Sequence, residues 1–288
     1  MSVVFLCVGA AKAGTSWVHR QLSGHPECHF RALKELHYFN ALDGRFLKRE
    51  YVKHNGWQQD LRARVDLGEA GPTEQQSRRL ADRAAWLDVL ALGREDRDAF
   101  LGYLQEGAGA AKVVGEMTPA YALLSTERLT GMARMAPDVR FLYLLRDPVE
   151  RLWSHVRMIA GRRDPGGEVT QTRCTSILNR TIGGEETQIV RRADYAGAIE
   201  RLTSAIPPAK LLSDVFEEVG AGEGLNRICD FLGIKRIAGA PDPVYEGRAL
   251  AMTPAQRSLA TNWLAPQYAA AEAALGRRPA TWAQGGFA

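Results

Sequence analysis

The chain has 288 residues, of which 45% are hydrophobic and 24% are charged, a composition typical of a globular protein with ample material for a buried core. The 37 Lys and Arg outnumber the 33 Asp and Glu, which gives a net charge of +4. This excess is too small to indicate a nucleic-acid-binding protein, but it suits a small polyanionic ligand. No apolar run reaches the ~18 residues that a membrane span needs, so none is expected.

The cysteines and histidines exclude two other kinds of site. The cysteines are widely spaced and form no CxxC pair; they are Cys7, Cys28, Cys174 and Cys229. This usage is typical of a reduced, intracellular protein, and we expect a cytoplasmic location. The histidines show no HExxH spacing, so no metal site is predicted.

The N-terminal segment predicts the start of a parallel sheet. Residues 3–8 (VVFLCV) are continuously apolar, which favours a strand buried on both faces. A glycine-containing loop follows, and from Ser16 the pattern predicts a helix that ends near Gly24. Residues 27–30 are a possible second strand.

The rest of the chain alternates predicted strands and helices. Residues 41–111 are polar, charged and mostly helical in pattern, which indicates a helical insertion or cap. Residues 161–192 are rich in Gly, Arg and Thr with little periodicity, which predicts a mobile lid loop. Strands are expected at 112–115, 139–145 and 210–216, and helices at 152–159, 195–205, 225–232, 254–263 and 268–275.

This alternation predicts the fold class. We expect an α/β fold with a P-loop-like central parallel β-sheet flanked by helices, carrying a helical insertion and a mobile lid. The whole chain, residues 1–288, is expected to form a single domain.

The loop GAAKAGTS, residues 9–16, has the composition of an anion site. Gly9 and Gly14 allow successive backbone N–H groups to turn inward, and the following helix adds its positive end. Thr15 and Ser16 supply hydroxyls, and Lys12 supplies a mobile charge. A plain strand-to-helix turn is the alternative. An ATP-binding loop would instead end in Gly-Lys-Ser/Thr.

A second motif lies in FLYLLRDPVERLWSH, residues 141–155. A buried strand ends at Leu145 and places Arg146 at its C-terminal edge, where α/β sheets bind ligands. Ser154 follows eight residues later, and both side chains can reach one phosphate if the turn folds back. A helix cap with a surface arginine is the alternative.

Both motifs resemble those of the PAPS-dependent sulfotransferase family. Residues 12–16 with His25-Pro26 match a KxGTS loop followed by a helix and HP, which binds the 5′-phosphosulfate of PAPS (3′-phosphoadenosine 5′-phosphosulfate). Arg146 and Ser154 resemble the pair that binds the 3′-phosphate. The resemblance implies PAPS as donor, PAP as product and no metal. It implies a donor site made of Lys12, Ala13, Gly14, Thr15, Ser16, Trp17, Arg146 and Ser154.

Two further segments resemble the bacterial and heparan-type glycan sulfotransferase branch. KELHYF, residues 34–39, is similar to KExHFF, which implies Glu35 as catalytic base and His37 as its assistant, with Lys12 stabilising the leaving phosphate. GEMTPAY, residues 115–121, is similar to GEKTPxY, but Met117 replaces the usual lysine. The implied acceptor is a hydroxyl or amine on a glycan, glycolipid or glycosylated metabolite.

Weaker matches extend the donor site. Tyr195 lies in a segment similar to a helix that carries a tyrosine near the nucleotide, although a core role fits it equally. Gly247 and Arg248 resemble a loop that covers the 3′-phosphate, although a surface role also fits. Two interpretations fit one further group equally well, the lining of a basic acceptor cleft or an ordinary solvated surface. This group consists of the arginines at 157, 162, 163, 173, 180, 191 and 192.

Two other functions remain open from sequence. A nucleotide kinase or other NTP-using enzyme would need a magnesium-binding carboxylate, for which Asp147 is the candidate. A non-catalytic nucleotide-binding module is favoured by Met117 and disfavoured by Glu35 and His37. The sequence does not indicate the oligomeric state.

Overall fold

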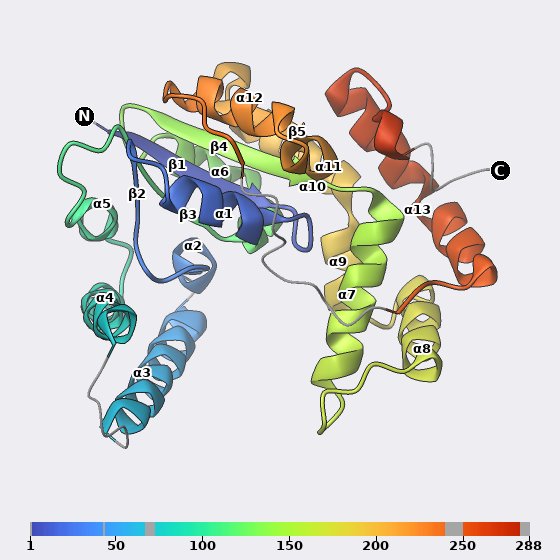
Figure 1. Ribbon diagram of the computed structural model, residues 1–288, viewed down its shortest axis with the longest axis horizontal. Coiled ribbons are helices and arrows are strands. Elements are labelled where there is room, and N and C mark those ends of the chain that lie inside the picture. Colours follow the sequence, from blue (N-terminus) through green and yellow to red (C-terminus); the bar gives the residue numbers. More distant parts are fainter. Residues whose placement is uncertain (1, 43, 67–72, 240–249, 283–288) are drawn as a thin grey trace.

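The computed structural model describes residues 2–42, 44–66, 73–239 and 250–282. Its centre is a parallel sheet of five strands in the order β2-β3-β1-β4-β5 (Figure 1). The strands are β1 (Val3–Gly9), β2 (Cys28–Phe30), β3 (Val113–Met117), β4 (Val139–Leu145) and β5 (Leu211–Val215). The predicted α/β fold with a central parallel sheet is confirmed.

The apolar runs of β1 and β4 explain why they lie at the centre of the sheet. Successive side chains of a strand point to opposite faces, so a run without polar residues needs cover on both. Leu6 faces one apolar cluster, and its neighbours Phe5 and Cys7 face another. The sheet is therefore the middle layer of three.

Helices cover the sheet on both faces. One layer consists of α1 (Thr15–Ser23) and α12 (Glu223–Leu232), which bury Phe5 and Cys7. The other includes α6 (Thr126–Ala133) and α10 (Tyr195–Ala205), which pack over Leu6. The short elements between them are α2 (Tyr38–Ala41), η1 (Pro119–Leu123), η2 (Pro208–Lys210), α11 (Phe216–Gly220) and η3 (Ala280–Trp282).

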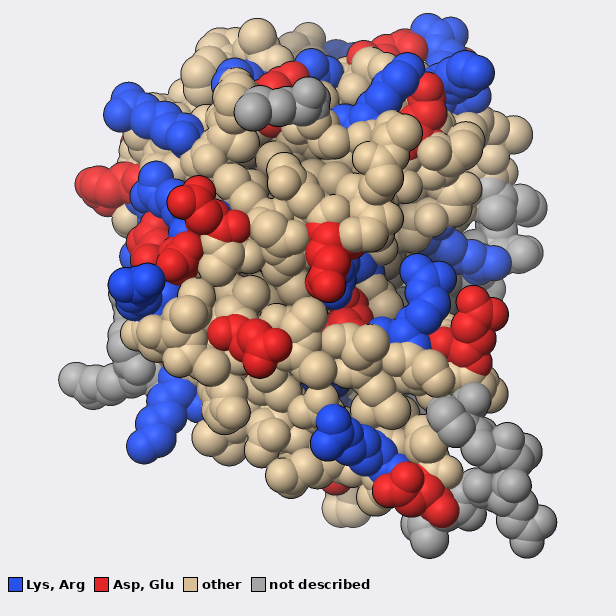
Figure 2. All heavy atoms as spheres, turned by 90° about the vertical axis from the view of Figure 1, so that its left-hand side faces the viewer, with Lys and Arg blue, Asp and Glu red and all other residues tan. Residues whose placement is uncertain are grey.

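The expected helical insertion is present and belongs to the main core. It contains α3 (Gly44–Asp66), α4 (Glu74–Ala91) and α5 (Arg97–Gln105), which lie to one side of the sheet (Figure 1). Trp86 of α4 and Phe100 of α5 are fully buried and join the same cluster as Leu6. On the outward face of this side, Lys and Arg lie interspersed with Asp and Glu (Figure 2).

The predicted lid loop at residues 161–192 is wrong. The segment forms α8 (Gln171–Ile182) and α9 (Thr187–Ala193), which pack against α7 (Pro148–Arg162). Ile177, Leu178 and Ile189 are buried in a third apolar cluster shared with α7. Because the two helices are short, their apolar residues produce little periodic signal in the sequence.

The C-terminal helix also differs from the prediction. Residues 254–263 and 268–275 belong to one helix, α13 (Pro254–Leu275), which continues through Pro266. Proline usually ends a helix because it lacks an N–H group. Here Leu264 packs in the α7–α9 cluster and Ala271 in the main core, so burial on both sides of Pro266 holds the helix together.

Gly115 of β3 tests how tightly the sheet is packed. A Cβ atom at this position would lie 2.2 Å from the backbone oxygen of Phe5 in β1. We expect Gly115→Ala to lower the free energy of unfolding by about 1–3 kcal/mol, the usual cost of overpacking. Gly102, at an exposed position of α5 with nothing within 4 Å, is the control. Gly102→Ala should leave stability unchanged or raise it by up to about 1 kcal/mol, because alanine favours helix. Urea unfolding measures both, and equal effects would contradict the packing argument.

Candidate functional site

The glycine loop lies at the C-terminal end of β1, where the chain turns into α1. Gly14 adopts φ 79°, in the left-handed region, and no side chain caps the first turn of the helix. A Cβ atom at Gly14 would lie 2.0 Å from the ring of Phe216, so glycine is required by both conformation and space. The uncapped helix start gives the loop the positive end that an anion site needs.

Lys12 lies within this loop in a strongly cationic environment. Its side chain is partly buried, and burial together with the guanidinium groups of Arg146, Arg162 and Arg157 lowers the pKa of the ammonium group. Such a concentration of positive charge opposes itself unless an anion joins it. The loop is therefore electrostatically prepared for a polyanion.

Arg146 joins the second motif to the first. Its guanidinium donates a hydrogen bond to the backbone oxygen of Lys12 at 3.2 Å. Tyr195, from α10, is fully buried; its hydroxyl accepts from the Arg146 backbone N–H at 3.2 Å and donates to the Arg146 oxygen at 2.9 Å. Tyr195 thus supports Arg146 from the core and does not line the surface of the site.

A hollow of about 510 Å³ adjoins the loop on the Arg146 side. Phe216 lines it and also covers Gly14, so the hollow borders the anion loop. The other lining residues are Arg146, Asp147, Glu150, Glu217, Arg257 and Thr281. Ser154 is half-buried in the second turn of α7. Gly247 and Arg248 lie outside the described residues.

Asp147 is occupied by structural contacts. One of its oxygens caps α7 by accepting from the Glu150 N–H at 2.9 Å, and the other accepts from the Tyr268 hydroxyl at 3.0 Å. Burial raises the pKa of the Asp147 carboxyl. A helix cap explains this carboxylate without a metal.

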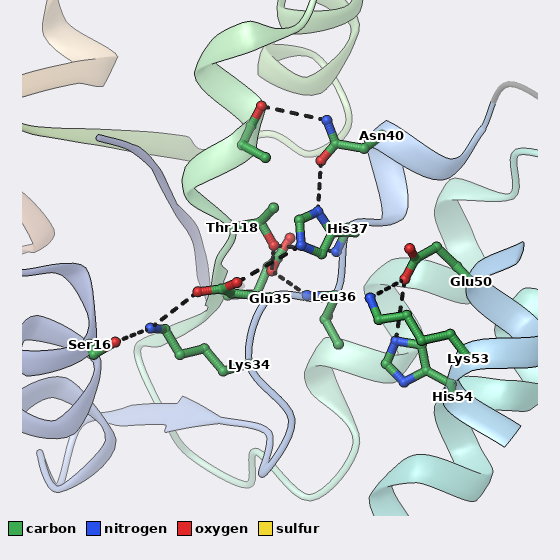
Figure 3. Close-up of polar contacts among 12 residues, drawn as sticks. Ser16, Lys34, Glu35, Leu36, His37, Asn40, Glu50, Lys53, His54 and Thr118 are labelled. Atoms are coloured by element: carbon green, nitrogen blue, oxygen red, sulfur yellow. Dashed lines mark hydrogen bonds and ion pairs between the residues drawn. The ribbon is translucent and has the colours of Figure 1, made fainter. Parts of the chain in front are cut away.

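A chain of polar contacts connects the loop helix to the second candidate group, Glu35 (Figure 3). Lys34 donates a short hydrogen bond to the Ser16 hydroxyl of α1, and its ammonium nitrogen lies 3.6 Å from Oε1 of Glu35. The other Glu35 oxygen lies 3.9 Å from Nε2 of His37. Nδ1 of His37 lies 3.2 Å from Oδ1 of Asn40, an acceptor, so the ring proton belongs on Nδ1.

The proposed catalytic residues share an unusual backbone conformation. Lys12, Glu35 and His37 have φ of 70°, 57° and 55°, and they are the non-glycine residues with positive φ in the described part of the chain. Left-handed backbone costs about 1–3 kcal/mol for such residues and persists at functional sites where the surroundings enforce it. This coincidence selects the same three residues as the sequence motifs.

A buried carboxyl group fixes the segment that contains Glu35 and His37 through hydrogen bonds. Glu116, near the end of β3, accepts hydrogen bonds from the Thr118 hydroxyl at 2.7 Å and from the Leu36 N–H at 3.4 Å. The Thr118 hydroxyl accepts from the His37 N–H at 3.3 Å. Burial raises the pKa of Glu116 to about 7. These bonds fix the backbone on both sides of Leu36 and so set the directions of Glu35 and His37.

Met117 lies away from the reacting groups. Its side chain is fully buried in the apolar cluster under α1, on the opposite face of the sheet from Leu6. A cation beside Glu35 comes instead from Lys34. The structure therefore supplies a positive charge near Glu35, although Met117 replaces the lysine of the similar segment.

The structure brings together most of the predicted residues. Arg146 contacts Lys12 in the loop that follows β1. Lys34 connects Ser16, at the start of α1, to Glu35, which lies beside His37. Ala13 and Trp17 are buried in the core, so only their backbone can serve a ligand. Lys34, Glu116, Thr118 and Phe216 were missed as site residues, although Lys34, Glu116 and Thr118 lie inside the quoted motifs.

Comparisons with known proteins agree with the fold of this chain. Residues 5–237 match a family described as the sulfotransferase family. A sulfotransferase from Alicyclobacillus acidocaldarius is similar in structure, with 22% identity, a TM-score of 0.65 and coverage of 98% of this chain and 99% of that one. The sulfotransferase domain of the Synechococcus PCC 7002 olefin synthase has 18% identity, a TM-score of 0.55 and coverage of 93% and 94%. Among curated proteins, no sequence matches significantly. In the described part of the chain, no helix is long and apolar enough to cross a membrane.

Glu116 should make the stability of the protein depend on pH. Its folded-state pKa of about 7 is above the unfolded value of 4.5, so its contribution is fully present below pH 4.5 and is lost as pH rises through about 7. This difference corresponds to roughly 3 kcal/mol. Glu116→Gln keeps an oxygen for Thr118 and Leu36 but cannot ionise, and should flatten the loss between pH 5 and 8. Urea unfolding measures it, with the exposed Glu185→Gln as control; an unchanged slope would refute the role.

Proposed function

Because the chain belongs to the sulfotransferase family, we propose that it transfers the sulfuryl group of PAPS to a hydroxyl or amine of an acceptor. The observation that carries the proposal is the hydrogen bond from Arg146 to the Lys12 backbone, which joins two anion-binding motifs at one sheet edge. A donor with phosphate groups at its 5′ and 3′ positions needs two such sites at fixed separation. The residues present fit this donor without a metal.

The donor contacts follow from the loop and its neighbours. Backbone N–H groups from Gly14 onward and the hydroxyls of Thr15 and Ser16 bind the 5′-phosphosulfate at the start of α1. Arg146 and Ser154 bind the 3′-phosphate. The hollow beside Phe216 receives the nucleoside between these two ends.

The reaction needs one proton transfer and one group transfer. Glu35 accepts the proton of the acceptor hydroxyl or amine as the oxygen or nitrogen bonds to sulfur. The bond between sulfur and the bridging oxygen of the donor breaks, and PAP leaves with the electron pair. Lys12 neutralises the charge that grows on that oxygen. Lys34 holds one oxygen of Glu35 in place, and the imidazole of His37 lies beside the other.

The acceptor is proposed as a glycan, glycolipid or glycosylated metabolite. This rests on the resemblance of residues 34–39 and 115–121 to glycan-modifying sulfotransferases. The kinase alternative loses its magnesium ligand, because both oxygens of Asp147 are engaged by the α7 cap and Tyr268.

Donor choice provides the first functional test. Adenosine 3′,5′-bisphosphate should bind far more tightly than adenosine 5′-phosphate, since each charge-assisted bond to the 3′-phosphate is worth about 1.5–3 kcal/mol. Arg146→Ala should remove most of this preference. Arg140→Ala, at the other end of β4 and paired with Asp138, should preserve it. Calorimetric titration measures all three proteins; equal affinity for the two nucleotides in the unmodified protein, or tight magnesium-dependent ATP binding, would overturn the assignment.

Lys12 and Glu35 should affect different steps. Lys12→Ala should weaken PAP binding and turnover together, because the ammonium group contacts the donor. Glu35→Gln should leave PAP affinity intact while turnover falls by ~10²–10⁴-fold, the usual range for a positioned general base. Turnover is followed with labelled PAPS on an acceptor found by screening, with Lys112→Ala and Glu185→Gln as surface controls. Near-normal turnover of Glu35→Gln would place the base elsewhere, with His37 as the next candidate.

A further inference from the structure

Arg151, near the start of α7, is a completely buried arginine. Its side chain is 0% exposed, and none of its guanidinium nitrogens has a hydrogen-bond partner among the described residues. Arginine is rarely found in this state, because the charge loses its hydration and gains no bond in exchange. A guanidinium that is retained without a partner therefore needs a physical explanation, which the site already described does not supply.

The side chains packed around Arg151 do not neutralise it. The guanidinium lies over the ring of Tyr195, 5.8 Å from its centroid, and the ring of Tyr143 packs edge-on against Tyr195 at 6.1 Å. Burial raises the pKa of Tyr195 to about 12 and also raises the pKa of Tyr143, so both phenols stay neutral. Burial and the Arg151 charge lower the pKa of the buried His155 to about 3, so its imidazole is neutral as well.

A first chain of contacts leads from Arg151 to the anion loop through α10. The Tyr195 ring contacts the Arg151 guanidinium, and the Tyr195 hydroxyl binds the backbone N–H and oxygen of Arg146. The Arg146 guanidinium in turn donates to the Lys12 oxygen in the loop. Arg151 and Lys12 therefore lie on opposite sides of the group that positions Arg146.

A second chain of contacts reaches the loop through β4. The ring of Tyr143 lies so close to Gly9 that a Cβ atom there would be 2.5 Å from it. Gly9 is the last residue of β1 and the first of the loop. Since Tyr143 packs against Tyr195, the two rings form a layer between Arg151 and the loop. Arg151 thus lies behind the anion loop, on its core side.

This position explains how an unpaired charge can act on the site. The two tyrosines are buried and keep water out of the layer, so the Arg151 charge is poorly screened across it. In the free protein, Arg146 on the loop side repels Arg151 and adds to the cost of its burial. An anion bound at the loop attracts both arginines and offsets this cost.

We propose that Arg151 is an electrostatic residue of the donor site, whose buried charge attracts the phosphate groups of the donor from behind the loop without touching them. The inference rests on the proposed use of PAPS and adds a residue that acts across the tyrosine layer. Because the charge has no counter-charge until the donor binds, Arg151 lowers the stability of the free protein and raises the affinity for the donor. The two effects have opposite signs, which separates them from a packing role.

Arg151→Met tests both effects, because methionine is an unbranched side chain without a charge. The melting temperature of the free protein should rise by about 2 °C or more, since removing an uncompensated buried charge stabilises the fold. PAP affinity should fall by about 10-fold or more, the size expected for a unit charge several ångströms away in poorly screened surroundings. The affinity for adenosine 5′-phosphate, which has one phosphate group where PAP has two, should fall less.

Arg140→Met is the matched control. Arg140 lies at the other end of β4 and pairs with Asp138 at 2.7 Å. Its replacement should not raise the melting temperature and should leave PAP affinity unchanged. Circular dichroism follows the melting of each free protein, and calorimetric titration gives the affinities for the two nucleotides.

Each outcome decides the proposal. An Arg151→Met protein that fails to fold or melts at a lower temperature would show that Arg151 is structural. Unchanged PAP affinity, or an equal loss of affinity for the two nucleotides, would also overturn the electrostatic role. If the unmodified protein does not bind PAP, the donor assignment fails and the role of Arg151 fails with it. The two failures are distinguishable, because only the second appears before any residue is changed.

Discussion

The hydrogen bond between the Arg146 guanidinium and the Lys12 backbone oxygen organises the proposed donor half of the site. It connects the segments that follow the central strand β1 and its neighbour β4. Arg146 can make it because the buried Tyr195 hydroxyl holds its backbone by both N–H and oxygen. The same arginine that fixes the loop also opposes the charge of Lys12, so the contact assembles the site and leaves it short of negative charge.

The acceptor half depends on a different constraint, the left-handed backbone at Glu35 and His37. Glu116 of β3 accepts from the N–H group of Leu36, and Thr118, just after β3, accepts from that of His37. Strain of this kind is tolerated because burial and hydrogen bonds leave the segment no alternative. Lys34 then joins the two halves, since its ammonium group contacts Ser16 on one side and Glu35 on the other.

The sequence predicted what depends on local pattern. The sequence patterns that predict the strands, the anion loop and the Arg146 segment are each no longer than about fifteen residues. The structure has these features in the expected places. The contacts between Glu116 and Leu36 span 80 positions, and no single-sequence pattern reports such a pair. The prediction of a loop at residues 161–192 failed for another reason. Ile177, Leu178 and Ile189 are buried by α7, and short helices that depend on tertiary packing show weak periodicity in the sequence. Tyr195 had two interpretations, and only its burial distinguishes between them.

The strand order β2-β3-β1-β4-β5 places the two proposed halves of the site on opposite sides of β1. β1 is flanked on one side by β4, which carries the proposed nucleotide contact of Arg146 at its end, and on the other by β3, which supports the segment of the proposed base. The insertion α3–α5 enters the chain between β2 and β3, on the base side. The surface of this insertion can therefore vary on the proposed acceptor side while Trp86 and Phe100 stay packed in the main core. The proposed donor motifs follow β1 and β4, lie outside the insertion and need not change with it.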